Sequence, residues 1–494
     1  MTSALLPRTT PDWVAAVKDP RRLRVEVLAG LVVALALIPE AISFSIIAGV
    51  DPRVGLFASF TMAVTIAVVG GRPAMISAAT GAVALVIAPL VADHGLPYLI
   101  AAVLLGGVLQ IALGLLGVAR LMRFVPRSVM VGFVNALAIL IFAAQVPQLV
   151  DVPWLVYPMA AVGLLIIFGL PRLTTAVPAP LVAIVVLTAT AVAAGIDVPT
   201  VGDQGALPDS LPALLLPDVP YTLETLQIVF PYALGLAVVG LLESLMTATL
   251  VDDLTDTRSS KTRESVGQGV ANLVTGAFGG MGGCAMIGQT MINVRSGART
   301  RVSAFLAGVF LLVLVVVLGD VVAVIPMAAL VAVMVFVSIA TFDWHSLRTL
   351  RRMPRSESAV MLVTVAVVVA TDNLAIGVGV GVLTACVLFA RRVAHLVTVT
   401  PGPVEDGVRT YTVSGALFFA SSNDLVGRFD YAGDPARVVV DLSAAQVWDA
   451  SSVAALDAVE HRYAARGTTV ELVGLTGDAG HWHRRLAGQL GAGH

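Results

Sequence analysis

Long apolar runs separated by short polar segments occupy about the first 400 of the 494 residues. A helix crosses a bilayer with about twenty apolar residues, and by that measure the pattern predicts about fourteen spans, several of them short or broken. Their expected limits are 25–48, 54–70, 76–92, 96–118, 128–149, 154–170, 177–195, 222–250, 264–278, 285–294, 302–319, 322–341, 357–371 and 374–396. The pattern therefore predicts a polytopic α-helical membrane protein.

The charges between these runs alternate along the chain. One set of loops is basic and includes Arg21, Arg22 and Arg24, Arg120 and Arg127, Arg258, Lys261 and Arg263, Arg295, Arg299 and Arg301, and Arg348, Arg351 and Arg352. The loops between them carry Asp93, Asp151, Asp203, Asp209, Asp218, Asp320 and Asp372. By the positive-inside rule the basic loops and both termini are expected in the cytoplasm. The alternation holds only if the short run 285–294 counts as a crossing.

A loop rich in proline and acidic residues, Gly195–Tyr221, contains no Lys or Arg and divides the apolar part into two halves. Each half has about seven spans, and the broken span is the third in each half. Because seven is odd, spans at equal positions in the two halves cross the membrane in opposite directions, which is the arrangement of an inverted repeat. The expected divisions are a cytoplasmic segment 1–24, a first repeat 25–200, an extracellular loop 201–221, a second repeat 222–400 and a soluble domain 405–494.

The more conspicuous broken span lies between Gly276 and Asn293, where the sequence reads GAFGGMGGCAMIGQTMIN. The glycines favour irregular backbone, and a short helix is expected to follow them. Unpaired backbone at membrane depth survives only where protein or a water-filled cavity surrounds it. A helix that begins there presents free N–H groups and positive partial charge, which suits an anion.

The matching break in the first half is Gly70-Gly71-Arg72-Pro73, which precedes the run 76–92. Paired interruptions in the two halves indicate a transporter site between the two helix starts. The alternative is that both stretches are close-packed glycine interfaces between helices. On the first interpretation the predicted substrate-binding residues near the helix starts are Ala79, Thr80, Gly81, Gly288 and Gln289.

Two acids lie within apolar spans. Glu40 follows Pro39 in the first span, and Glu243 occupies the corresponding span of the second half. Carboxyl groups at membrane depth are costly to ionise and are functional candidates, so both are predicted to take part in proton coupling. The alternatives are a structural carboxyl at Glu40 and a brace for the second half-helix at Glu243. Phe44 lies one helical turn after Glu40 and is predicted either to line the site or to pack in the core.

A dense charged turn follows the eighth span, with Asp252, Asp253, Asp256, Arg258, Lys261, Arg263 and Glu264. It is interpreted as a solvated turn that fixes helix ends rather than a nucleotide or metal site. The seven histidines show no metal-ligand spacing. No Walker loop and no GxSxG motif is present, so neither an ATP-driven pump nor a hydrolase is suggested. No cofactor, no metal and no nucleic-acid partner is expected.

The composition changes near Pro401. The segment Tyr411–Ala420 alternates as a strand does, and Arg437–Asp441 reads as a buried strand. Ser451–Arg466 has helical periodicity and Thr468–Leu475 reads as a further strand. These elements predict a small cytoplasmic α/β domain.

The segment Ile38–Ser59, IPEAISFSIIAGVDPRVGLFAS, resembles the SulP (sulfate permease) family of anion transporters. Further similarity lies at Glu243–Ser244, Arg263–Asn272 and Asn293–Thr300, and in the soluble part at Gly415–Ala420, Val440–Ser443 and Asp449–Ser452. The resemblance covers nearly the whole chain. It implies seven-plus-seven inverted repeats forming a core and a gate domain, a cytoplasmic STAS domain and a homodimer in a bacterial inner membrane.

The resemblance also implies that substrate binds between the third and tenth helices, with contacts from the first span at Glu40 and Phe44. Many family members have a basic residue where Gln289 stands and a proline where Thr80 stands. Ser451 matches a position that is phosphorylated in related bacterial regulators, and Ser452 replaces the glycine that usually follows it.

These observations predict a secondary anion transporter rather than an enzyme. Because the expected site has a carboxyl group and no cation, proton–anion symport is favoured. Family substrates include sulfate, bicarbonate and dicarboxylates such as fumarate, and a small dicarboxylate is the favoured substrate. The alternatives are an anion channel with uncoupled conductance and a nucleobase–proton symporter of the same architecture. The soluble domain is expected to regulate or assemble the transporter.

Overall fold

The computed structural model describes residues 12–118, 120, 125–174, 178–394, 397–475 and 485. The chain forms two compact units, Met1–Val382 and Leu383–His494. Part of the predicted segment 1–24, its first eleven residues, lies outside the described residues. In the predicted domain 405–494, the residues after Leu475, apart from Arg485, also lie outside the described residues.

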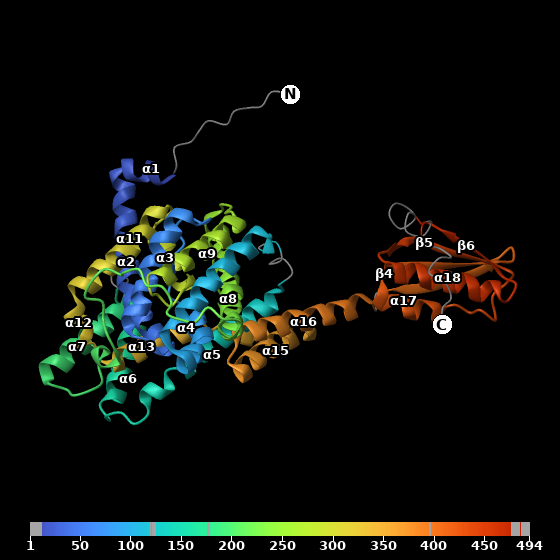
Figure 1. Cartoon of the computed structure of the whole chain (residues 1–494). Helices are drawn as coiled ribbons and strands as arrows, with labels where there is room; N and C mark the ends of the chain where they lie inside the picture. Colours follow the sequence, from blue (N-terminus) through green and yellow to red (C-terminus); the bar gives the residue numbers. More distant parts are fainter. Residues whose placement is uncertain are drawn as a thin grey trace. The chain divides into compact units, whose positions relative to one another are not determined.

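The first unit is built almost entirely from helices among its described residues (Figure 1). Helices distant in sequence lie side by side, for example α2 and α3 against α11. The bounds of its elements are α1 Asp12–Lys18, α2 Pro20–Ile47, α3 Pro52–Val69, β1 Ser77–Ala78, α4 Gly81–Leu115, α5 Arg127–Ala143, α6 Val156–Gly169, α7 Ala179–Ala194, α8 Leu223–Thr255, α9 Lys261–Ala277, β2 Cys284–Ala285, α10 Ile287–Arg295, α11 Arg301–Val317, α12 Gly319–Ala323, α13 Met327–Thr341, α14 Trp344–Thr349 and α15 Arg355–Thr371. Helix α16, Leu374–Ala394, begins in this unit.

Seven stretches of the described chain are helical, long and apolar enough to cross a membrane. They are Pro20–Ile47, Pro52–Val69, Gly81–Leu115, Arg127–Leu149, Leu223–Thr255, Met327–Thr349 and Leu374–Val393. Shorter apolar helices lie at Val156–Arg172, Ala179–Ala194 and Arg301–Val317. The chain therefore forms a polytopic helical membrane unit, as the apolar runs predicted.

Several predicted boundaries differ from the structure for identifiable reasons. The predicted runs 76–92 and 96–118 both fall in α4, which consists of two helical segments separated by a kink at Gly95, where φ is 78° and ψ is −173°, so the predicted break between the runs is present. Residues 76–80 are not helical, because Ser77 and Ala78 form β1. The predicted run 322–341 is split into α12 and α13 around Pro326, a residue that disfavours helix at the position before it.

The second unit contains a four-stranded sheet in the order β3-β4-β5-β6 (Figure 1). The strands are β3 Thr398–Glu405, β4 Val408–Leu417, β5 Arg437–Val447 and β6 Thr469–Val473. The first pair is antiparallel and the other two are parallel. Helices α17 Phe419–Leu425 and α18 Ala450–Ala464 pack against the strands. The sequence interpretation did not assign β3, because its residues are mostly exposed and include two prolines.

The apolar core of this unit encloses one buried acid, Asp434, whose side chain is 0% exposed. Its Oδ2 accepts hydrogen bonds from the hydroxyl groups of Tyr411, at 2.8 Å, and Tyr463. Its Oδ1 forms an ion pair with Arg409 at 3.2 Å. Burial raises the pKa of Tyr463, and the hydrogen bond to Asp434 raises it further, so this phenol remains a donor at neutral pH.

Replacing Asp434 with Asn should therefore destabilise the sheet. The change weakens hydrogen bonds to a charged acceptor, each worth about 1.5–3 kcal/mol. Hydrogen–deuterium exchange on the full chain should show faster exchange in β4, β5 and α18. The control is Asp406→Asn at the exposed β3–β4 turn, where φ is 49° and Asn is well tolerated. Equal exchange in the two variants would show that the buried acid does not stabilise the unit.

Candidate functional site

The two broken segments meet at a short antiparallel strand pair. In this pair Ser77 lies opposite Ala285, and Ala78 lies opposite Cys284. The backbones approach so closely that a Cβ on Gly283 would lie 2.0 Å from the carbonyl oxygen of Ala78, so only glycine fits there. The strand pair therefore fixes the starts of α4 and α10 beside each other.

The first turns of both helices follow this strand pair directly. The hydroxyl of Thr80 caps α4 by accepting from the backbone N–H of Val83 at 3.4 Å. Helix α10 begins at Ile287, and its N-cap residue, Met286, makes no side-chain cap. The free N–H groups of such a first turn, with the positive end of the helix dipole, favour an anion.

A cavity of about 270 Å³ lies at these helix starts. Its walls come from α2, α4, α8 and α10 and from two further helices, α5 and α13. The residues that line it are Glu40, Phe44, Thr80, Gly81, Ala82, Phe133, Val134, Leu137, Ile141, Glu243, Met286, Ile287, Gly288, Gln289, Ile292, Phe336, Val337, Ala340 and Thr341. The structure thus brings together all but one of the predicted site residues.

The predicted residue outside this wall is Ala79. It is buried, and its backbone N–H donates to the hydroxyl of Ser59 at 3.2 Å. Gly81 packs against Phe44, because a Cβ there would lie 2.9 Å from the phenyl ring. A Cβ on Gly288, by contrast, would meet nothing within 4 Å, so this residue faces open space.

The charged groups that line the cavity are carboxyl groups only: Glu40 and Glu243. No Lys, Arg or His is among the described residues that line it. Gln289 lines the same cavity as Glu40. Gln289 is 1% exposed, and its carbonyl oxygen Oε1 has no hydrogen-bond partner among the described residues. Any anion held here would rest on helix N-termini and neutral donors.

A buried chain of hydrogen bonds joins Glu243 to the start of α4. The thiol of Cys284 donates to Glu243 Oε2 at 3.0 Å, and its sulfur lies 3.1 Å from the hydroxyl of Thr80. The hydroxyl of Ser244, next along α8, accepts from the backbone N–H of Ala285 at 3.0 Å. Glu243 therefore lines the cavity and contacts the second broken segment through Cys284, and its role in proton coupling stays a prediction.

A second brace holds the glycine-rich backbone before β2. The side-chain amide of Asn272, on α9, donates to the carbonyl oxygen of Gly283 at 3.0 Å and accepts from its N–H at 2.9 Å. The same amide donates to Gln110, on α4, at 2.9 Å. These contacts satisfy backbone groups that would otherwise be unpaired at membrane depth.

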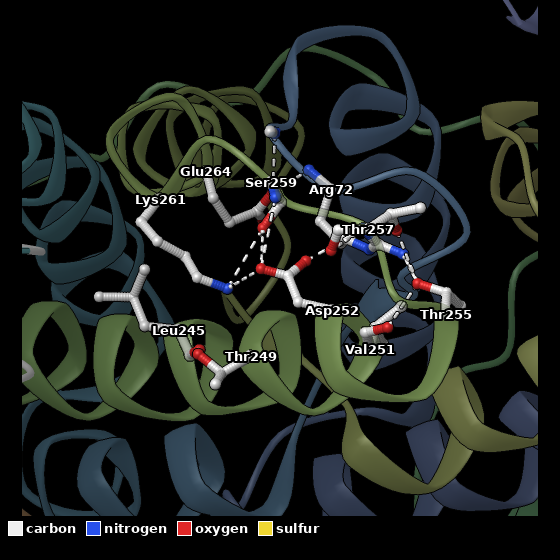
Figure 2. Close-up of polar contacts among 11 residues, drawn as sticks. Arg72, Leu245, Thr249, Val251, Asp252, Thr255, Thr257, Ser259, Lys261 and Glu264 are labelled. Atoms are coloured by element: carbon white, nitrogen blue, oxygen red, sulfur yellow. Dashed lines mark hydrogen bonds and ion pairs between the residues drawn. The ribbon is translucent and has the colours of Figure 1, made fainter.

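The charged turn after α8 holds the loop that leads into β1 (Figure 2). Asp252 lies between Arg72 and Lys261, with ion-pair distances of 3.0 and 2.9 Å. It also accepts from the hydroxyl of Ser259 at 2.9 Å. The turn therefore fixes more than its own helix ends, because Arg72 belongs to the broken segment of the first half.

Sequence reasoning missed the part of the wall that comes from α5 and α13. Its side chains are Phe133, Val134, Leu137 and Ile141, and Phe336, Val337, Ala340 and Thr341. They recur at helical spacing on one face of each helix. An apolar face of this kind looks the same in sequence whether it meets lipid, protein or a cavity.

The chain matches the model of the Sulfate permease family over residues 23–159 and 148–364, and that of the STAS domain over residues 402–482. It is 58% identical to "Putative sulfate transporter YbaR" of Bacillus subtilis over 92% of this chain and 95% of that protein. It is 28% identical to the bicarbonate transporter BicA of Synechocystis, over 92% of this chain and 89% of that protein.

Two solved structures resemble the fold. The transmembrane domain of a cyanobacterial bicarbonate transporter BicA aligns with a TM-score of 0.64 at 27% identity, covering 74% of this chain and 98% of that one. The murine anion transporter Slc26a9 in the inward-facing state aligns with a TM-score of 0.79 at 16% identity. That alignment covers 98% of this chain and 92% of the mouse chain, so the same architecture extends through both units.

Proposed function

Because the chain belongs to the sulfate permease family, we propose that it is a secondary active transporter that carries one small anion together with a proton. Its relatives are named as sulfate and bicarbonate transporters, and none of those names describes an enzyme. The observation that carries the proposal is the meeting of two helix N-termini at one cavity whose described lining residues include carboxyl groups and no Lys, Arg or His.

The size of the cavity supports a small substrate. Pockets for drug-sized ligands occupy roughly 300–1,000 Å³, and this one is slightly smaller, at about 270 Å³. Polar donors are few and come mainly from the backbone at the starts of α4 and α10. We propose sulfate, bicarbonate or a small dicarboxylate such as fumarate as substrate, with the dicarboxylate preferred because one of its carboxylates can be protonated and so lose charge in a site without a fixed cation, whereas sulfate stays divalent.

Proton coupling follows from the position of Glu40. An ionised carboxylate on α2 would repel an anion that enters the same small, poorly solvated space. Protonation removes that repulsion and lets the carboxyl group donate a hydrogen bond. Gln289 lines the same cavity, and its Oε1 has no hydrogen-bond partner among the described residues, so this oxygen is available to accept from a protonated acid. When Oε1 accepts from the protonated acid, the amide N–H groups are left for the anion.

We further propose that the transporter works as a homodimer in a bacterial inner membrane with both termini in the cytoplasm. The positive loops support this orientation. We assign a regulatory or assembly role to the STAS domain. Ser451 is exposed in the first turn of α18, whereas Ser452 is buried and bonded to Asp449, so a modifying enzyme would reach only the first of the two.

Uptake by the purified protein in proteoliposomes tests the proposal. Radiolabelled fumarate, sulfate, bicarbonate and uracil should be compared with and without an inward proton gradient. We expect saturable uptake of one anion that increases with the gradient and shows counterflow. Continuous current without saturation or counterflow would instead identify a channel, and uptake of uracil alone would identify a nucleobase symporter.

A further inference from the structure

A second hollow lies away from the substrate cavity, where α3 ends and α11 begins. It has a volume of about 690 Å³. Its walls are apolar except at Arg263, Thr300 and Arg301, and comprise Val17, Ala67, Val68, Pro73, Val302, Phe305 and Leu306. Val68 is 65% exposed and Phe305 is 41% exposed, so the apolar wall is open to the surroundings of the protein. We call this hollow the α3–α11 groove.

Both arginines are held in place by the last carbonyl groups of α3. Arg263 donates to the carbonyl oxygens of Val69, at 3.0 Å, and Val68, at 3.3 Å. Arg301 donates to those of Ala67, at 3.1 Å, and Gly70, at 2.6 Å. Each guanidinium has five N–H donors, so each keeps donors that these contacts do not use.

The positive charge of the pair is only partly offset by neighbouring groups. Among the described residues neither arginine forms an ion pair within 4.0 Å. The two guanidinium groups are close enough to repel each other. Glu264 also interacts with Arg301, but its oxygens already accept from the backbone of Gly71 and Arg72 and from Gln268. A ligand with negative charge would therefore find two oriented cations near a single carboxyl group.

We propose that the α3–α11 groove binds one anionic phospholipid, with its phosphate at Arg263 and Arg301 and an acyl chain along Val68, Val302 and Phe305. Guanidinium groups suit phosphate oxygens because they offer paired N–H donors in one plane. Basic pockets between spanning helices at an arginine-rich membrane face recognise anionic headgroups. An acyl chain can pack against the apolar wall, whereas a free phosphate ion cannot use this surface. The groove therefore fits a phospholipid better than a free phosphate ion.

Binding there would act on the transport domain through α3. The lipid would neutralise two cations that hold the end of α3, immediately before the loop that leads into β1 and the substrate cavity. A ligand that binds the folded state alone raises its stability. The lipid is therefore expected to stabilise the folded membrane unit whether or not the chain transports the anions proposed above.

The test compares lipid-dependent stabilisation of the full-length protein in detergent. Phosphatidylglycerol and phosphatidylcholine of the same acyl composition are added in series, and the thermal midpoint and the bound mass, by native mass spectrometry, are recorded. We expect phosphatidylglycerol to raise the midpoint more than phosphatidylcholine and to appear as one retained lipid. Each arginine contributes about fivefold in affinity, on the order of 1 kcal/mol per cation, so Arg263→Gln/Arg301→Gln should bind about 25-fold more weakly.

Two further variants separate charge from folding. Arg263→Lys/Arg301→Lys keeps both charges and should recover most of the preference for phosphatidylglycerol. Arg348→Gln, an exposed arginine on α14 outside the groove, should behave as wild type. The readout is the rise in the thermal midpoint that lipid produces, not the midpoint without lipid. A variant that is less stable without lipid therefore remains informative. The proposal would be overturned if the two lipids raised the thermal midpoint equally. It would also be overturned if phosphatidylglycerol raised the midpoint of Arg263→Gln/Arg301→Gln as much as that of wild type.

Discussion

Substituting Gln for Glu40 should leave an anion transporter whose uptake no longer responds to an inward proton gradient. Glutamine has nearly the shape of a protonated glutamic acid and offers an N–H donor in place of the acidic O–H. Under the proposed mechanism it mimics the state in which the cavity accepts an anion, and it cannot release the proton proposed to couple the two fluxes. In proteoliposomes, the ratio of uptake with the gradient to uptake without it should fall to unity.

The matched comparison is Glu243→Gln, because Glu243 is the other carboxyl group in the same cavity. Its contact with Cys284 makes it a brace for the second broken segment, so this change should lower total uptake while the gradient still accelerates what remains. The other titratable group in contact with Glu243 is the Cys284 thiol. If Glu40→Gln kept the wild-type response to the gradient and Glu243→Gln lost it, the proton site would be assigned to α8.

The environment of Glu40 favours this assignment. No titratable group other than Glu243 shares the cavity among its described lining residues. The helices packed against α2 do carry charged or titratable residues, but these do not line the cavity. They include Lys18 on α1, Arg53 on α3, Asp93, His94 and Tyr98 on α4, Arg295 on α10 and Arg301 on α11. A pH response of uptake should therefore report the two carboxyl groups.

The sequence was sufficient to predict the position of the cavity, because the signals there are local. Runs of glycine cannot span a membrane as a regular helix, and an acid within an apolar helix is conspicuous wherever it occurs. Loop charge then supported counting the short run 285–294, which overlaps α10, as a crossing. These features identify Glu40, Thr80, Gly81, Gly288 and Gln289 without any knowledge of distant contacts.

The parts that sequence reasoning missed depend on contacts between distant segments. A strand of two residues has no periodicity, so β1 and β2 are recognisable only once they are paired. The place of Cys284 between Glu243 and Thr80 likewise follows from the fold alone. The cavity faces of α5 and α13 likewise resemble ordinary lipid-facing or buried helix surfaces.

Removing the carboxyl group of Glu264 should have the largest effect on stability. Glu264 is 0% exposed, and its Oε2 accepts from the backbone N–H groups of Gly71, at 2.7 Å, and Arg72, at 2.9 Å. Its Oε1 accepts from Gln268 at 2.8 Å, which in turn donates to the hydroxyl of Ser77, in β1, at 2.7 Å. One side chain thus joins α9 to the loop and the strand that precede α4.

No nearby group can replace these bonds. The loop is pressed so closely on α9 that a Cβ on Gly71 would lie 2.2 Å from the carbonyl oxygen of Ser260, which leaves no room for the backbone to turn toward another acceptor. In Glu264→Ala two buried backbone N–H groups lose their acceptor, and each unsatisfied group costs about 1–3 kcal/mol. Removal of a buried carboxyl group returns part of this cost, so a loss of several kcal/mol is the expected result.

Thermal unfolding followed by tryptophan fluorescence, together with anion uptake, measures this effect. Glu264→Ala should unfold at a clearly lower temperature and lose uptake, because β1 and the start of α4 would no longer be held at the cavity. Glu264→Gln keeps one acceptor oxygen and should lie between this variant and wild type. Glu224→Ala, an exposed acid in the first turn of α8, should cost no more than about 1 kcal/mol. A Glu264→Ala protein as stable as the Glu224→Ala protein would mean that the loop between α3 and β1 holds the site without this buried acid.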